Sequence, residues 1–151
     1  MRFEEILEQK GWLVYKTKGI SMLPMLHENQ DLVVVRAPEG RLKKYDVALY
    51  RRGDAYVLHR VIGVREGGYD IRGDNTYSIE KVPENAVIGV LSSFVREGKK
   101  YEVTDFSYRL YARIWNAIYP LRVLYRRCYH FAWMTARRLG IAPLLKKLLR
   151  W

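Results

Sequence analysis

A serine, a histidine and an acidic turn follow one another along the first half of the chain. Ser21 lies in a turn-forming segment between a glycine and a proline, and His59 lies in an apolar run. Gly73-Asp74-Asn75 comes next, at a distance from His59 that one β-hairpin could bridge. A hydroxyl, an imidazole and a carboxylate are the nucleophile, base and orienting acid that acyl transfer requires. The spacing therefore predicts a nucleophilic site on Ser21 and His59.

The elements that must position these residues are short strands. The hydrophobic pattern predicts a helix over residues 3–9 and strands over residues 12–15, 32–35, 47–50, 56–62, 69–72, 87–91 and 101–103. Arg51-Arg52-Gly53-Asp54 predicts a hairpin turn. Short strands at close spacing are typical of a β-barrel or sandwich. We therefore expect a mainly β core over residues 1–104.

The composition changes at residue 105. Apolar residues then recur every three or four positions over 106–118, 121–139 and 144–151, with Pro120 between the first two stretches. Residues 105–151 hold ten Lys and Arg and one acid, whereas residues 1–104 hold 17 Lys and Arg and 15 acids, in a chain of net charge +11. The sequence predicts a second domain over 105–151, built from basic, aromatic, amphipathic helices that follow the β core.

Three partners suit this basic segment. Helices of this kind lie well at an anionic membrane surface. They could instead cap the β core or form a dimer contact, or they could bind nucleic acid. These alternatives stay open at this point.

Several classes of protein are excluded. The chain has one cysteine, Cys128, so it forms no intramolecular disulfide and no Cys-based zinc site. No apolar run approaches the ~20 residues that span a bilayer, and the N-terminus lacks the pattern of a secretory signal. We expect no cofactor, no metal and a cytoplasmic protein, with attachment to the membrane surface as an alternative.

Four segments, in this order, resemble the signal peptidase I family of serine peptidases. Residues 19–24 (GISMLP) resemble its nucleophile segment, and residues 45–50 its Gly-Asp strand, with Tyr45 in place of the glycine. Residues 58–63 (LHRVIG) are similar to its general-base segment and residues 72–75 (RGDN) to its Gly-Asp-Asn segment. The resemblance covers roughly residues 12–95. It implies a signal-peptidase-like β core and a serine endopeptidase that cleaves a peptide or precursor protein.

The resemblance also implies a role for each matched residue. Ser21 would attack the scissile carbonyl, and His59, which stands where bacterial members carry Lys, would take its proton as in the endoplasmic-reticulum and archaeal branch. Backbone groups at Ser21 and Gly19 would bind the oxyanion, because Gly19 stands where some relatives carry a hydroxyl. Met22 and Pro24 would lie along the substrate.

The acid that orients His59 is left with two candidates. The Gly-Asp-Asn segment offers Asp74, and the position about six residues further on, which carries the acid in the His-type branch, is Glu80. We rank Asp74 slightly above Glu80, because Glu has an extra methylene.

The family resemblance implies small residues next to the cleaved bond. The leader of a ribosomally made peptide is a plausible substrate, and the Glu- and Lys-rich residues before Ser21 suggest a member without an N-terminal transmembrane anchor. A non-catalytic or self-cleaving regulator is the alternative function.

Overall fold

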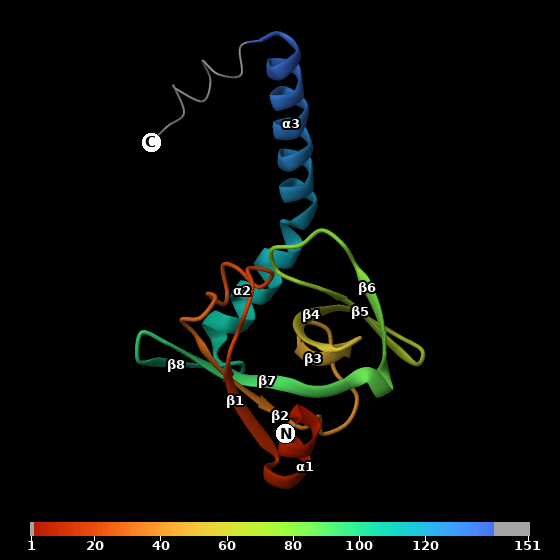
Figure 1. Ribbon diagram of the computed structural model, residues 1–151, viewed down its shortest axis with the longest axis vertical. Coiled ribbons are helices and arrows are strands. Elements are labelled where there is room, and N and C mark those ends of the chain that lie inside the picture. Colours follow the sequence, from red (N-terminus) through yellow and green to blue (C-terminus); the bar gives the residue numbers. More distant parts are fainter. Residues whose placement is uncertain (1, 141–151) are drawn as a thin grey trace. The chain divides into compact units, whose positions relative to one another are not determined.

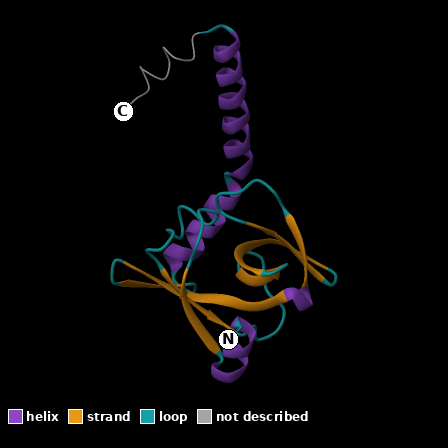
Figure 2. Ribbon diagram, in the orientation of Figure 1, coloured by secondary structure: helices purple, strands orange, loops and turns teal. Residues whose placement is uncertain are grey.

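The computed structural model describes residues 2–140. Its contacts divide the chain into one compact unit that ends at Asn116 and another that begins at Ala117. We describe each unit by itself and call the described part of the first one, residues 2–116, the β unit. Figure 1 labels the elements along the chain, and Figure 2 separates helices from strands by colour.

The β unit contains an eight-stranded antiparallel sheet. In chain order its elements are α1 (Phe3–Lys10), β1 (Trp12–Lys16), β2 (Leu32–Arg36), β3 (Val47–Arg52), β4 (Ala55–Arg65), β5 (Gly68–Arg72), β6 (Glu80–Pro83), a 3₁₀ turn (Glu84–Ala86), β7 (Val87–Arg96), β8 (Lys99–Glu102) and α2 (Phe106–Ala117). Hydrogen-bonded neighbours follow the order β1-β2-β7-β3-β4-β5-β6, and β8 pairs with β7. The strands β3 and β4 thus lie in the middle of the sheet.

The prediction of a mainly β core followed by helices is confirmed for the described residues. Each of the seven strands that the sequence predicts is present, most of them longer than expected, and the turn after β3 joins it to β4 as a hairpin. The short strand β6 was not predicted. The structure shows one sheet, and closure into a barrel or sandwich stays a prediction. The helix predicted over 144–151 lies outside the described residues.

The sheet separates two apolar clusters, and β3 contributes to both. Its sequence Val-Ala-Leu-Tyr is buried on both faces, as in strands covered on both sides. Val47 and Leu49 belong to one cluster, and Ala48 and Tyr50, whose side chains alternate with them, belong to the other. Full burial of each large apolar side chain contributes about 1.5–3 kcal/mol. This central strand and its partner β4, which carries His59, therefore form a rigid base.

The helix α2 belongs to the β unit. Tyr108 and Tyr111 on one side of it pack against the cluster that contains Leu49. Phe106, Leu110 and Ile114, spaced four residues apart, are exposed on another side. Although the composition changes at residue 105, the contacts thus keep α2 with the strands.

The second unit contains the helix α3 (Tyr119–Arg138). Pro120 stands in its first turn, where a missing N–H costs no hydrogen bond, so the predicted interruption is the start of a new helix. The helix carries five arginines and no acid. Among the described residues, no helix combines the length and the apolar character that crossing a membrane requires.

Candidate active site

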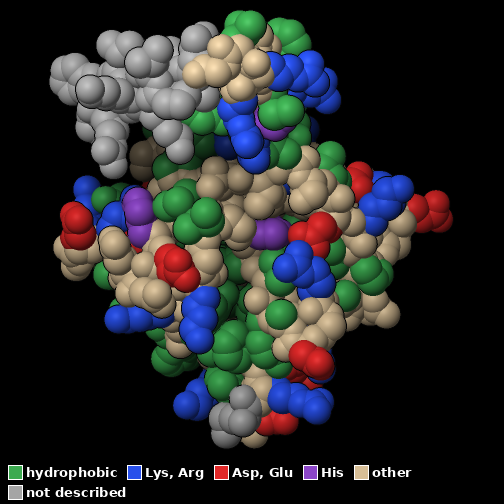
Figure 3. Space-filling view, turned by 45° about the horizontal axis from the view of Figure 1, so that its top comes forward, with side chains coloured by type: hydrophobic (Ala, Val, Ile, Leu, Met, Phe, Trp, Pro, Cys, Tyr) green, Lys and Arg blue, Asp and Glu red, His purple; other side chains and the backbone are tan. Residues whose placement is uncertain are grey.

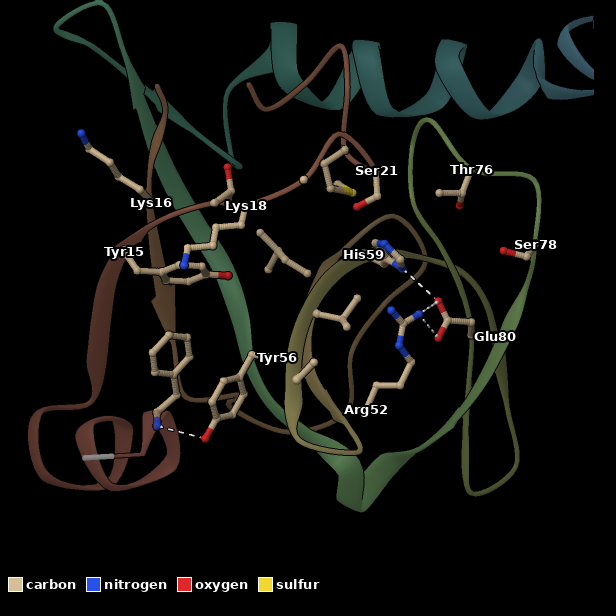
Figure 4. Close-up of a pocket in the computed structure, with 17 residues that line it drawn as sticks. Tyr15, Lys16, Lys18, Ser21, Arg52, Tyr56, His59, Thr76, Ser78 and Glu80 are labelled. Carbon is tan, nitrogen blue, oxygen red and sulfur yellow. Dashed lines mark hydrogen bonds and ion pairs between the residues drawn. The ribbon is translucent and has the colours of Figure 1, made fainter. Parts of the chain in front are cut away.

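A cavity of about 630 Å³ lies beside Ser21 and His59. Figure 4 shows the side chains of both residues pointing into it, and Figure 3 shows apolar side chains gathered in a hollow between charged ones. Its walls come from α1, β1, the Ser21 turn, the β3–β4 hairpin and the segment before β6. The lining residues are Phe3, Tyr15, Lys16, Thr17, Lys18, Gly19, Ser21, Met22, Arg52, Ala55, Tyr56, Val57, Leu58, His59, Thr76, Ser78 and Glu80.

The Gly-Asp-Asn segment holds the Ser21 turn in place. The Asn75 N–H donates to the Ser21 carbonyl at 2.8 Å, and the Asn75 side-chain amide donates to the Ile20 carbonyl at 3.2 Å. A Cβ added to Gly73 would stand 2.6 Å from the Ser21 carbonyl oxygen and 3.0 Å from Nε2 of His59. Gly73 therefore lies against both residues, and only a glycine allows this approach.

The far end of the same loop is fixed by an ion pair on a buried carboxylate. Asp31, fully buried, accepts hydrogen bonds from the Arg96 guanidinium at 2.8–3.2 Å and from the His27 N–H at 2.8 Å. Arg96 also donates to the Met25 carbonyl. Burial raises the pKa of the Asp31 carboxyl, but the hydrogen bonds from Arg96 and His27 outweigh it, and the pKa is lowered. The carboxylate stays charged and ties the Ser21 loop to β7.

His59 points one ring nitrogen at an acid and the other toward the serine. Its Nδ1 lies 3.2 Å from Oε1 of Glu80 and 3.3 Å from the Tyr50 hydroxyl oxygen. The Nε2 edge is the one next to Gly73 and the Ser21 backbone. An acceptor at Nδ1 favours the tautomer with its proton there. In that tautomer Nε2 has a free lone pair on the Ser21 side.

Burial keeps this imidazole neutral. His59 is 5% exposed, and the loss of water around the ring lowers its pKa below the ordinary value near 6.5. The Glu80 carboxylate raises the pKa and opposes this effect, and the Arg52 guanidinium lowers it again. Because the net direction is down, His59 at pH 7 is an uncharged base.

Glu80, and not Asp74, is the carboxylate on Nδ1, so our ranking of the two is reversed. Glu80 accepts two hydrogen bonds from Arg52, at 3.1 and 3.2 Å, which fix its orientation (Figure 4). Asp74 forms a two-pronged pair with Arg60, with both contacts at 2.7 Å, and accepts a hydrogen bond from the Tyr111 hydroxyl at 3.1 Å. Arg60 is 0% exposed and Asp74 3% exposed. Asp74 therefore holds the turn from inside the core.

The two predicted oxyanion donors differ in the structure. The Gly19 N–H donates to the Glu28 carboxylate at 2.8 Å, so this donor is already engaged. The Ser21 N–H has no acceptor within residues 2–140. Of the pair, Ser21 is thus the donor that remains available.

The two predicted substrate contacts also differ. Met22 lines the cavity but is 4% exposed and belongs to the apolar core. Pro24 is exposed, lies outside the cavity lining and accepts a hydrogen bond from Arg96 through its carbonyl. Of the two, Met22 alone lies where it could touch a ligand in this cavity.

Several residues of the site were missed in the sequence. Arg52 and Tyr50 surround His59 and Glu80, but neither was given a role: Tyr50 ends one of the four family-like segments, and Arg52 belongs to the predicted hairpin turn. Phe3 reaches the cavity from α1. The pairing of β3 with β4 places Tyr50 and Arg52 on the strand beside His59. Burial along β3 offered no local signal, because residues 47–50 are all buried and residues 51 and 52 are both exposed. Among the described residues, no cluster of three or more His, Cys, Asp or Glu side chains could hold a metal ion.

No family model matches this chain, and no curated protein is similar to it.

Proposed function

We propose that the chain is a serine peptidase in which Ser21 is the nucleophile, His59 the general base and Glu80 the group that orients His59. The observation that carries the proposal is the position of His59 between two partners. Its Nδ1 meets a carboxylate that Arg52 fixes, while its Nε2 edge lies with the Ser21 backbone against Gly73 at the cavity. A nucleophile, an oriented base and an adjoining cavity are the parts that such catalysis needs.

The reaction follows from this arrangement. As the Ser21 oxygen attacks the scissile carbonyl, its proton passes to Nε2 of His59, and the C=O electron pair moves to the oxyanion. The Ser21 N–H donates to that oxyanion. When the C–N bond breaks, His59 returns the proton to the leaving amine, and an acyl-serine remains. A water molecule, deprotonated by His59, then releases the acid and restores Ser21.

Glu80 has its largest effect while His59 is protonated. The imidazolium formed during attack lies 3.2 Å from the carboxylate oxygen, in a site where burial strengthens the attraction. The two hydrogen bonds from Arg52 hold that carboxylate aimed at Nδ1. The attraction between Glu80 and the imidazolium thereby offsets the cost of burying the charged imidazole.

The resemblance to the signal peptidase I family supports the same proposal. The segments that carry it are distant in the sequence, yet three of them meet in the contacts among Ser21, His59, Gly73 and Asn75. Residues 47–50 of the fourth belong to β3, which pairs with β4 beside His59. We therefore propose a signal-peptidase-like enzyme that cleaves a peptide or precursor protein, with the leader of a ribosomally made peptide as one substrate.

An extended substrate has a place to bind. β1 and β6 stand at the two ends of the strand order, and both contribute cavity residues, Tyr15 and Lys16 from one and Glu80 from the other. A strand at the end of a sheet carries unpaired N–H and C=O groups that an extended peptide can pair with.

The test is loss of cleavage in matched variants of the full chain. Ser21→Ala and His59→Ala should each abolish cleavage of a peptide library, read by mass spectrometry, because each removes a group that takes part in the reaction. The controls are Ser107→Ala on α2 and His130→Ala on α3, both at exposed positions. They should cleave as the parent does. Unchanged cleavage in either of the first two variants would rule out this mechanism.

A second proposal, attachment to an anionic membrane surface, is favoured by α3. Its apolar residues Leu121, Leu124, Tyr125, Tyr129 and Phe131, and Leu139 directly after its end, are each between 55% and 74% exposed. Arg122, Arg126, His130 and Arg137 recur at helical spacing on the opposite side. An apolar face beside cations without acids is the pattern of a helix that lies in a bilayer interface. A nucleic acid would leave the apolar face uncovered, so we prefer the membrane.

A further inference from the structure

One end of the cavity is built from aromatic rings. The rings of Phe3 and Tyr56 stack with their centres 4.3 Å apart, and Phe3 meets Tyr15 at 5.1 Å. Met22, Val57 and Leu58 add apolar atoms to the lining. A lining of this kind favours a large apolar side chain, because burial of such a group contributes about 25 cal/mol per Å².

α1 is held firmly at this end of the cavity. The Phe3 N–H donates to the Tyr56 hydroxyl oxygen at 3.3 Å, and the Tyr56 hydroxyl donates to Glu4 at 2.6 Å. The Gly11 N–H closes the helix by donating to the Leu7 carbonyl, and Leu7 is buried in the core. The Phe3 ring is therefore a fixed wall of the cavity.

The volume is too large for a small side chain. Pockets of ~300–1,000 Å³ enclose whole drug-sized ligands, and this cavity measures about 630 Å³. The methyl group of an alanine would leave most of the aromatic wall without contact. The aromatic end of the cavity therefore suits a larger apolar side chain than the small residues that the family resemblance implies next to the cleaved bond.

The charges on the walls are unequal. Lys16, Lys18 and Arg52 line the cavity, with Glu80 as the one acid among the lining residues. Arg52 and His59 already engage Glu80. In Figure 4 Lys16 points away, whereas the Lys18 side chain, which lines the cavity, extends across to the Tyr15 ring. Neither lysine forms an ion pair within residues 2–140. Lys18 thus offers a positive charge to whatever fills the cavity.

We infer that the cavity recognises a peptide segment with a bulky apolar residue, Leu or Phe, next to an acidic residue. The apolar side chain packs against Phe3, Tyr15 and Tyr56, and the carboxylate pairs with Lys18. This inference rests on the proposed function, because it places the peptide beside Ser21. The substrate class that it names differs from the one implied by the family resemblance, which has small residues next to the cleaved bond.

Binding to the full chain carrying Ser21→Ala tests the inference without any catalysis. Fluorescent peptides of one scaffold are compared by anisotropy. They carry four residue pairs at the two variable positions, Phe-Asp, Phe-Lys, Ala-Asp and Ala-Lys, each in both orders. Phe-Asp in one order should bind most tightly, with each single change costing about tenfold or more. Equal affinity for all four, or the tightest binding for an Ala peptide, would overturn the inference.

Two substitutions locate the contacts. In the Ser21→Ala chain, Lys18→Glu should reverse the preference for Asp over Lys, whereas Lys44→Glu, at an exposed position outside the cavity lining, should leave it as it was. Phe3→Ala should remove the preference for Phe over Ala, and Phe3→Leu should restore part of it. Circular dichroism checks that α1 remains folded. An unaltered preference in both Lys18→Glu and Phe3→Ala contradicts the assignment.

A separate assay tests the proposed catalytic function. A small activated ester, p-nitrophenyl acetate, does not need the cavity, and its hydrolysis by the parent chain should disappear with Ser21→Ala. If that hydrolysis depends on Ser21 while peptides with all four residue pairs bind alike, the substrate class is wrong and the serine site stands. If the peptides bind as expected and Ser21 has no effect on ester or peptide hydrolysis, the catalytic proposal fails.

Discussion

The β unit and the helix α3 use charge in opposite ways. In the β unit the fully buried Arg60 and Asp31 are each paired at short distance, Arg60 with Asp74 and Asp31 with Arg96. In α3 there are five arginines and no acid over twenty residues. Charges of the first kind hold loops and strands in place. Those of the second kind have no acid within their own helix.

Exposure of apolar side chains shows the same contrast. The largest fully buried side chains include Tyr50, Tyr69 and Leu49, all in the β unit, whereas Phe131 and Tyr125 of α3 are 74% and 73% exposed. A core that buries its rings can position a site. A helix that exposes its rings is suited to a surface that would cover them. The predictions below would break or sharpen this division.

The largest effect is expected from breaking the buried pair. Asp74→Asn leaves the Arg60 guanidinium buried without a counter-charge, which should lower the free energy of unfolding by about 3–5 kcal/mol. Urea denaturation measures this loss in the free energy of unfolding. The double variant Arg60→Met/Asp74→Leu should recover most of the loss, because it leaves no charge uncompensated.

A surface pair provides the control for this experiment. Asp54 forms an ion pair with Arg51 at 3.5 Å, but its side chain is fully exposed. Asp54→Asn should unfold at the same urea concentration as the parent. If Asp74→Asn behaves like Asp54→Asn, the buried pair does not stabilise the turn as we describe.

The second prediction concerns α3. Arg127→Gln/Arg137→Gln should weaken binding of the full chain to vesicles rich in phosphatidylserine by about 2 kcal/mol, or about 30-fold, since each cation near the surface contributes ~1 kcal/mol. Co-sedimentation at two salt concentrations measures it. Lys43→Gln/Lys44→Gln in the β unit removes the same charge and should bind as the parent does. Equal vesicle binding by all three proteins would contradict the proposal that the arginines of α3, and not the lysines of the β unit, contact the membrane.

Much of the β unit could be predicted, because its strands follow local rules. Leu-Val-Val-Val in β2 has high strand propensity, and the turn between β3 and β4 contains Gly53. β6 was missed, since Glu-Lys-Val-Pro is short and ends in proline. It forms by pairing with β5, with Val82 opposite the buried Tyr69. A strand that depends on a partner rather than on its own pattern leaves little local signal.

The site could be predicted only where the segments themselves carry the chemistry. Ser21 and His59 stood out by type and spacing, and the structure brings them to one cavity. The acid that contacts His59 did not stand out in this way. The choice between Asp74 and Glu80 depends on the register of β6 against β5 and on Arg60, which binds Asp74. The cavity itself is assembled from distant parts, so neither Phe3 nor Arg52 could be connected with Ser21 beforehand.

The third prediction separates the two groups that act on His59. Glu80→Gln removes the charge that raises the His59 pKa, so the acidic limb of the pH–rate profile should move to lower pH. Arg52→Gln removes a charge that lowers it, so that limb should move to higher pH. Both should lose activity, Glu80→Gln by about tenfold or more, because a positioned base contributes ~10²–10⁴. Shifts in the same direction for both variants would show that charge at this pair does not control His59.

The smallest effect is expected in the pH dependence of stability, which reports on His59 without any substrate. Burial lowers the His59 pKa in the folded chain, whereas in the unfolded chain it stays near 6.5. Below pH 6.5 the unfolded state therefore binds a proton that the folded state does not, and stability falls as the pH falls toward the folded-state pKa. Above pH 6.5 the two states bind protons equally at His59, and His59 contributes nothing to the change of stability with pH.

His59→Gln should lose less stability between pH 6.5 and 5 than the parent, by at most about 1.4 kcal/mol per pH unit. His130→Gln, on α3, is the matched control and should keep the parent's slope in urea denaturation. Parallel curves for all three proteins would mean that His59 is protonated as easily in the folded chain as in the unfolded one, and His59 would then be charged too readily to act as the base at the acidic end of this range.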